Sequence, residues 1–151
     1  MTSLVFRVLD AQVIGGLADH IAIEDGRGTM SYAQLLHESA SVAGALIHMG
    51  VDAGARVVID LPADRDRVIS VLACARIGAV TDDAGDFRLA GTPPVLHTLT
   101  TEVTWGVLVQ AGRVEPASAP ETDADGYEQL MRDLHADIFD PLTAGGTITH
   151  P

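Results

Sequence analysis

The sequence predicts an α/β fold, and three neighbouring segments are the basis of this prediction. Residues 56–62 form a short, mostly apolar run that is rich in β-branched residues and ends at Pro62, as expected of a buried parallel strand. Residues 64–77 then show a nearly continuous apolar helical pattern, which Gly78 can end. Residues 79–81 can return as a second strand. Together they predict a βαβ unit, whose crossover should be right-handed.

The segment before this unit has clear helix-start signals. Ser31 can serve as the N-cap, and Gln34 stands where it would complete a capping box. Apolar residues follow at helical spacing, and Gly50 stands where a left-handed C-terminal cap is expected. This pattern predicts a helix over about residues 32–49. Upstream, residues 20–31 predict two short strands around a turn at Asp25 and Gly26.

The pattern changes after residue 81. Residues 82–86 are polar and predict a loop, whereas residues 95–101 and 104–111 each predict a strand. Residues 115–125 have two prolines and few apolar positions, which is typical of an exposed linker. An apolar stripe over residues 126–139 predicts one last helix, closed by Asp140 and Pro141. We therefore expect residues 1–151 to form a single domain, with an α/β core at 20–80 and a divergent, acidic β-hairpin, linker and helix at 81–151.

The charge balance limits the partners that can be expected. The chain has 21 acidic residues, nine arginines and no lysine, which gives a net charge of −12. Such a charge repels phosphate backbones and anionic lipids, so we expect neither nucleic acid nor a membrane as a partner. The single cysteine, Cys74, lies within the apolar helical pattern, which indicates a core position and a reducing, cytoplasmic location. No apolar run has the length of a signal peptide or a membrane-spanning helix.

Residues 20–80 resemble the N-terminal subdomain of the adenylate-forming, or AMP-binding, acyl-CoA synthetases. The features that resemble the family are the end of the hairpin at residues 29–35, residues 43–46 in the first helix, Gly50 and Gly54, and the pair Leu61 and Pro62 before the second helix. Residues 72–80, Leu-Ala-Cys-Ala-Arg-Ile-Gly-Ala-Val, are most similar to the acetyl- and propionyl-CoA synthetase branch. The resemblance implies a partial version of that subdomain's fold and an ancestry among enzymes that join a carboxylate to ATP.

Motifs that the resemblance implies for catalysis are absent from these 151 residues. The family wraps the ATP phosphates in a loop rich in Ser, Thr and Gly that ends in Lys. It also uses an aromatic-Thr-Glu motif, an Asp that holds the ribose, and a second Lys from a mobile C-terminal domain. Where the branch has a Gly-Gly-Phe segment linked to CoA, this chain has three aspartates within residues 82–86, which would oppose an anionic ligand.

The segment most similar to the phosphate loop is residues 143–151, which has glycines and hydroxyls but no Lys. Its candidate cofactor-binding residues are Thr143, Gly145, Gly146 and Thr147. The competing interpretation is a frayed terminus.

Other groups of reactive side chains predict no site. The six histidines lack the spacing that would place two metal ligands on one helical face, so no metal is expected. No serine lies in a Gly-x-Ser-x-Gly elbow. His135 and Asp137 are two residues apart and do not share a helix face, which favours a solvated helix end over an acid–base pair. We therefore predict no catalytic residue.

These observations predict a non-catalytic, degenerate relative of the AMP-forming acyl-CoA synthetases. It would act by association with itself, most simply as a homodimer, or with another protein, and it would bind no cofactor. One alternative is a module that binds an acyl group, CoA or an adenylate, or one part of a split synthetase, with ATP, AMP or CoA as its ligand. Another is an enzyme of unrelated chemistry, which a deep pocket with His97, His135 or the pair Asp82 and Asp83 would favour.

Overall fold

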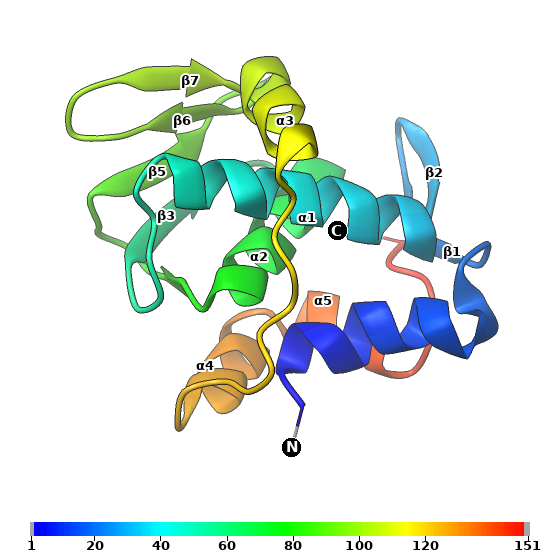
Figure 1. Cartoon of the computed structure of the whole chain (residues 1–151). Coiled ribbons are helices and arrows are strands. Elements are labelled where there is room, and N and C mark those ends of the chain that lie inside the picture. Colours follow the sequence, from blue (N-terminus) through cyan, green and yellow to red (C-terminus); the bar gives the residue numbers. More distant parts are fainter. Residues whose placement is uncertain (1, 150–151) are drawn as a thin grey trace.

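A computed structural model describes residues 2–149 and contains a five-stranded mixed sheet, a separate hairpin and several helices (Figure 1). The strands are β1 (Ile21–Asp25), β2 (Gly28–Ser31), β3 (Arg56–Asp60), β4 (Val80–Thr81), β5 (Phe87–Ala90), β6 (Val95–His97) and β7 (Glu102–Thr104). The helices are α1 (Tyr32–His48), α2 (Arg65–Ile77), α3 (Trp105–Val114), α4 (Tyr127–Leu134) and α5 (Ala136–Thr143). None of the helices within residues 2–149 is long and apolar enough to cross a membrane.

The predicted βαβ unit is confirmed. Strand β3 pairs in parallel with β4, and α2 connects them. The Asp64 carboxylate accepts a hydrogen bond of 2.9 Å from the Asp66 N–H at the start of α2. Gly78 ends the helix at φ +73°, a left-handed conformation that favours glycine. The α/β fold class predicted from the sequence is therefore observed.

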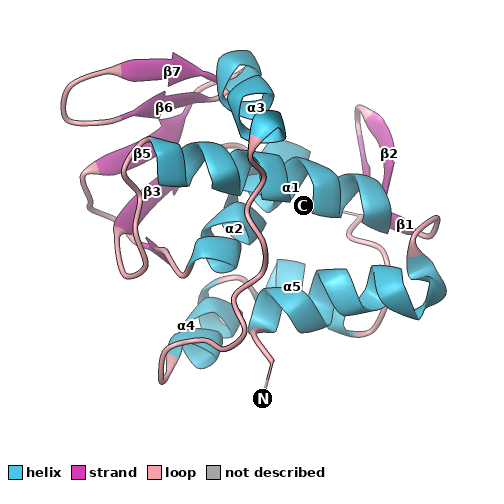
Figure 2. Cartoon of the chain, in the orientation of Figure 1, coloured by secondary structure: helices cyan, strands magenta, loops and turns pink. Residues whose placement is uncertain are grey.

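The start of α1 is also as predicted. The Gln34 N–H donates to the Ser31 hydroxyl at 3.1 Å, and the Ser31 N–H donates to the Gln34 side chain at 2.8 Å, so the capping box is complete. Strands β1 and β2 form the expected antiparallel hairpin directly before it. Helix α1 packs on both α2 and α3, which in turn contact the sheet (Figure 2).

The sheet has the order β4-β3-β5-β6-β7, and its two faces differ in character. Ile59, Leu89 and Leu96 are aligned across three strands and belong to the core on one face. The neighbouring row, which includes Arg88 and Glu102, is exposed on the other face. Because side chains alternate along a strand, one face meets the helices and the other meets solvent.

Two predictions for the second half of the chain are wrong. Residues 95–101 form a strand only up to His97, and residues 105–111 belong to helix α3 rather than to a strand. Short apolar runs fit either structure, and here packing favours the helix, because Leu108 and Gly112 lie one turn apart and are buried. Gly112 lies so close to α1 that an added Cβ would be 1.6 Å from the Ser41 carbonyl oxygen.

The predicted last helix is instead two helices. Helix α4 ends at Leu134, His135 adopts a non-helical conformation, and α5 continues past Pro141 to Thr143. Pro141 therefore does not close the helix, although it removes one N–H donor from it. Phe139 and Leu142 are completely buried, and their packing holds α5 in the helical conformation.

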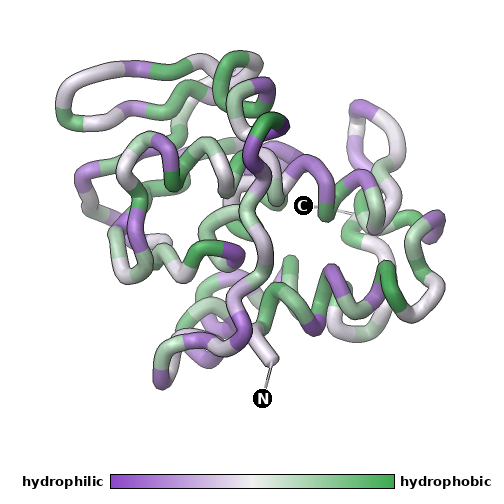
Figure 3. Tube along the Cα trace, viewed as in Figure 1, coloured by the Kyte–Doolittle hydropathy of each residue, from purple (hydrophilic) through white to green (hydrophobic). Residues whose placement is uncertain are grey.

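Both ends of the described chain pack on the core, and neither contact was predicted. Residues 4–17 are helical, including the π-helical segments Phe6–Asp10 and Val13–Leu17, and Leu4, Val5 and Leu9 are completely buried. At the other end, Ile148 lies in parallel beside Ile23 of β1. Hydrophobic residues run through the helices, whereas the linker between α3 and α4 is more hydrophilic (Figure 3).

Candidate functional site

A cavity of about 800 Å³ lies where α1 and α2 end, and we call it the α1–α2 cavity. The ends of the two helices and the loop at residues 51–54 form one part of its wall. The other part comes from the linker at residues 117–126 and the first turns of α4. This linker runs as an extended strap from α3 to α4 (Figure 1).

The wall of the cavity is largely apolar. Ile47, Val51, Ile77 and Leu130 line it, and two of them remain accessible, with Ile47 52% and Leu130 39% exposed. The Tyr127 ring also lines the cavity, but its hydroxyl donates to the Ala79 carbonyl at 2.6 Å. Burial raises the pKa of Tyr127, so this phenol stays neutral. The cavity can therefore hold an apolar group.

The charged groups of the α1–α2 cavity are mainly negative. Asp52, Asp123 and Asp125 line it, and the carbonyl ends of α1 and α2 add partial negative charge. Arg76 is the one cationic side chain in the wall, but its guanidinium is 2.6 Å from the Asp10 carboxylate and its side chain is 1% exposed. Burial lowers the pKa of Arg76 and raises that of Asp10. The cavity thus offers no free cation to an anionic ligand.

The candidate cofactor residues lie elsewhere, at the end of α5 and beside β1. The Gly145 N–H donates to the Leu142 carbonyl at 3.1 Å, and the Gly146 N–H donates to the Pro141 carbonyl at 2.9 Å. The hydroxyl of Thr143 donates to Phe139, and that of Thr147 donates to Ile21. These donors are engaged within the chain, so they do not form an open cradle for a phosphate.

The expectation of a frayed terminus is wrong as far as residue 148. Ile148 is 2% exposed, and its N–H donates to the Ala22 carbonyl at 2.7 Å. The Tyr32 hydroxyl donates to the Gly146 carbonyl at 2.6 Å. The glycines form a turn directly after α5, in which Gly145 has φ +70°. This segment fastens α5 to the hairpin.

Every arginine of the chain forms an ion pair with a carboxylate within the described residues. The pairs are Arg7–Glu128, Arg27–Asp66, Arg56–Asp82, Arg65–Asp25, Arg67–Asp137, Arg76–Asp10, Arg88–Asp60, Arg113–Glu38 and Arg132–Glu128. Since the sequence has no lysine, each of its side chains with a permanent positive charge has a partner.

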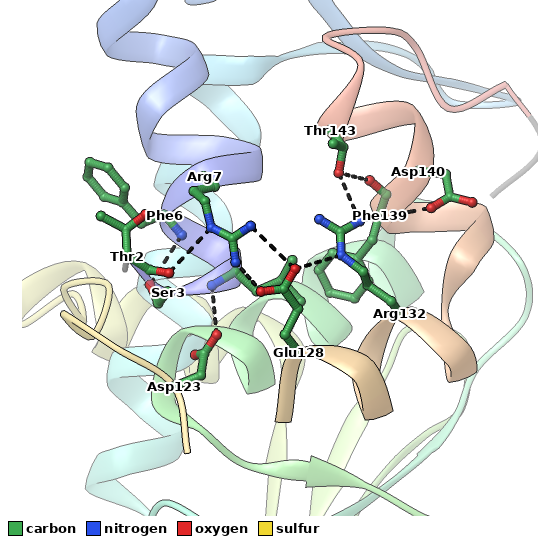
Figure 4. A network of polar contacts seen from close by, with 11 residues as sticks. Thr2, Ser3, Phe6, Arg7, Asp123, Glu128, Arg132, Phe139, Asp140 and Thr143 are labelled. Carbon is green, nitrogen blue, oxygen red and sulfur yellow. Dashed lines mark hydrogen bonds and ion pairs between the residues drawn. The ribbon is translucent and has the colours of Figure 1, made fainter. Parts of the chain in front are cut away.

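Two of these pairs, which share Glu128, belong to a network that joins both ends of the molecule (Figure 4). Glu128 accepts hydrogen bonds from Arg7 in the N-terminal helical segment and from Arg132 at 3.0 Å. Arg132 also donates to the Thr143 hydroxyl at 3.0 Å. The hydrogen bonds from Arg7 and Arg132 hold the pKa of Glu128 below its usual value. The network positions α4 and α5 against the N-terminal segment.

His135 lies at the junction between α4 and α5. Its Nε2 atom lies 2.7 Å from the Thr81 hydroxyl at the end of β4. Burial, with a smaller effect from Arg67, lowers the pKa of His135 to about 4, so the imidazole is neutral at pH 7. Neither the α1–α2 cavity nor the smaller cavity beside Arg56 and Phe87 is lined by His97, His135, Asp82 or Asp83.

The sequence alone did not reveal the α1–α2 cavity. Its walls come from three segments that are distant along the chain, at residues 47–54, 76–80 and 117–130, and no short motif marks them. The one local signal was the apolar pattern of α2, which covers so much of the helix that packing on more than one side was expected. A second, smaller cavity of about 310 Å³ lies beside Arg56 and Phe87. No group of three or more potential metal ligands occurs within residues 2–149.

Comparison with known proteins identifies relatives of the first half of the chain. A model of the AMP-binding enzyme family matches residues 10–82. The acetyl-coenzyme A synthetase of Deinococcus radiodurans is 45% identical over 84 residues, which are 52% of this chain and 13% of that protein. The mitochondrial acyl-CoA synthetase short-chain family member 3 of Mus musculus is 35% identical over 86 residues, which are 53% of this chain and 13% of that protein. The chain thus spans only a small part of the length of these relatives.

Parts of solved structures are also similar to this chain. The apo structure of MatB from Rhodopseudomonas palustris is 29% identical, with a TM-score of 0.49, and the match covers 54% of this chain and 16% of that one. The structure of VinN in complex with 3-methylaspartate is also 29% identical, with a TM-score of 0.48, over 52% of this chain and 21% of that one. Residues 10–82 of this chain are therefore related to the AMP-binding enzymes, and their relatives include the acetyl-CoA synthetases.

Proposed function

We propose that this chain is a non-catalytic relative of the AMP-forming acyl-CoA synthetases and that it acts through association rather than through activation of a carboxylate. The observation that supports this most directly is the pairing of all nine arginines with carboxylates, in a chain without lysine. Activation of a carboxylate by ATP develops charge on phosphate groups, and cations stabilise that charge. These residues offer no free arginine or lysine for this role.

The alternative, a module that binds an acyl group, CoA or an adenylate, has one observation in its favour. The α1–α2 cavity has a volume of about 800 Å³, within the range of small-molecule sites. Its carboxylates, however, would repel the phosphates of ATP, AMP and CoA. Saturation-transfer NMR with ATP, AMP and CoA separates the two proposals. We expect no transfer to any of the three, and transfer to one of them would favour the binding module.

The association surface that we propose is an apolar stripe on α3. It consists of Val107, Ala111 and Val114, which we call the α3 stripe. These residues are spaced four and three apart, so they share one face of the helix. Val107 is 59% and Val114 is 88% exposed. Apolar stripes at this spacing pack against a second helix, and a two-fold dimer is the commonest way to supply one.

The apolar stripe of residues 126–139 gives the dimer no support. Met131 and Ile138 are completely buried within the chain, together with Phe139 and Leu142. Leu130 and Leu134 are the members that remain partly exposed. Residues 127–143 thus cover their own domain, and the proposed contact moves to α3.

Light scattering at micromolar concentration tests the dimer. We expect a mass of about 32 kDa, twice the 15.8 kDa of one chain. Replacing Val107 and Val114 by Glu should give the monomer mass, because it places charges in the apolar contact. Leu99→Glu is the matched control, since Leu99 is an apolar residue that is 79% exposed in the loop between β6 and β7, outside the stripe. A wild-type mass near that of one chain would contradict self-association.

A further inference from the structure

We propose that the α1–α2 cavity binds a small organic cation that carries an apolar tail. This ligand class differs from the anionic nucleotides and CoA, and the proposal does not depend on whether the chain dimerises. It rests on three features of the cavity: its size, its apolar wall and the sign of its charges.

The volume of the cavity and its apolar wall are the reason that the proposed ligand has an apolar tail. A volume of about 800 Å³ is in the range of sites that enclose most of a small molecule. Ile47 and Leu130 are exposed on opposite parts of the wall, one at the end of α1 and one on α4. An apolar tail between them would remove both side chains from water, which is the main source of affinity for such groups.

The carboxylates of the cavity are the reason that the proposed ligand carries a positive charge. Asp52 and Asp125 are exposed and line the cavity from the loop after α1 and from the linker. Neither side chain forms an ion pair within the described residues, although every arginine there has a partner. Asp123 adds a third carboxylate, which accepts a hydrogen bond of 2.7 Å from the Leu4 N–H.

Helix ends add to this preference. The C-terminal ends of α1 and α2 meet the cavity, and carbonyl groups at a helix C-terminus favour a cation. The N-terminus of α4 also meets it and favours an anion, but Asp123 and Asp125 lie just before α4 and offset that effect. Arg76 forms an ion pair with Asp10, so it does not make the cavity positively charged.

Three ligands with the same eight-carbon tail test the proposal: octylammonium, octanol and octanoate. Amide chemical shifts in NMR titrations report the site, and Gly54, Gly78 and Gly126 are useful because they line the cavity. We expect octylammonium to shift these amides and to bind at least about tenfold more tightly than octanoate, with octanol between them. Octanoate or octanol binding as tightly as octylammonium would overturn the proposal, and so would octylammonium binding elsewhere or not at all.

A double variant, Asp52→Asn with Asp125→Asn, tests the carboxylates. The structure shows no hydrogen bond from a described residue to either side chain, so the fold should be unaffected. Octylammonium should bind several-fold more weakly, whereas octanol should bind as before. Asp133→Asn is the control, because Asp133 is exposed on α4 and does not line the cavity. Equal loss in the control and in the double variant would overturn the assignment to this cavity.

Discussion

The charged residues at the start of α2 hold three parts of the molecule together. Arg65 pairs with Asp25 in the hairpin, and Asp66 pairs with Arg27 at the hairpin turn. Arg67 pairs with Asp137 in α5. In the sequence these charges alternate over residues 64–67, a pattern that by itself indicates only an interaction with the helix dipole. Their partners are about 40 and 70 residues away along the chain, so no local pattern could identify them.

The pair of Arg65 and Asp25 should make the largest contribution among these charges. The Asp25 side chain is 5% exposed, and its hydrogen bonds with Arg65 lower its pKa to about 2. Asp25→Asn should therefore reduce the free energy of unfolding by about 2 kcal/mol at pH 7, measured by denaturant titration. Because the folded pKa is below the unfolded one, this contribution is present above pH 3.8 and is lost as the pH falls towards 2.

Asp60→Asn is the matched control for that variant. Asp60 pairs with Arg88, but both side chains are largely exposed, at 63% and 48%. Exposed pairs contribute little, so we expect a change within about 0.5 kcal/mol. Equal effects of the two variants would contradict the role given to Asp25.

His135 should make stability depend on pH in a different range. Its folded pKa of about 4 is below the ordinary value of 6.5, so the unfolded chain binds a proton more readily. Stability is therefore expected to fall as the pH decreases from 6.5 to 4. In His135→Asn this part of the decrease should be absent when unfolding is measured across that range. A wild-type curve that is flat between these values would show that His135 is not buried as described.

At the scale of elements, the helices that contact one another most closely depend on glycine. Gly112 of α3 faces the Ser41 carbonyl of α1, and a Cβ would be 1.6 Å from that oxygen. Gly112→Ala should therefore force α1 and α3 apart and destabilise the protein by at least about 1–3 kcal/mol in denaturant titration. Gly106→Ala on the same helix is the control, because nothing lies within 4 Å of its added Cβ.

The two glycines should give effects of opposite sign. Alanine favours a helix over glycine by about 1 kcal/mol, so Gly106→Ala is expected to be neutral or stabilising. If Gly112→Ala were also neutral, the close contact between α1 and α3 would be incorrect.

Elements with strong local signals were predictable from the sequence. The capping box at Ser31 and the glycine at residue 78 fixed the ends of two helices, and the apolar run between residues 56 and 62 indicated a strand that the structure ends at Asp60. Within that strand Val57 is the completely buried residue, whereas Val58 is half-buried. Helix α3 and the break at His135 were not predictable, because the contacts with Ser41 and Thr81 that accompany them come from distant segments.

On the scale of the whole molecule, most apolar surface is covered by other segments of the same chain. The outer face of the sheet bears ion pairs such as Arg88 with Asp60, and this polar character suits a face that meets water. Residues 127–143 cover the core, and residues 146–148 lie along the hairpin. The apolar groups that remain accessible include the α3 stripe and the rim of the α1–α2 cavity. These are the surfaces at which we propose association and ligand binding.

We propose that the chain does not activate carboxylates, although residues 10–82 are related to the AMP-binding enzymes and to acetyl-CoA synthetases. Exchange of labelled pyrophosphate into ATP tests this most directly, with acetate, propionate and a longer fatty acid as substrates and a full-length acetyl-CoA synthetase as the positive control. We predict an exchange rate equal to that of a blank without protein, since no free arginine or lysine is available to the phosphates. An exchange rate above the blank that depends on added carboxylate would contradict the account.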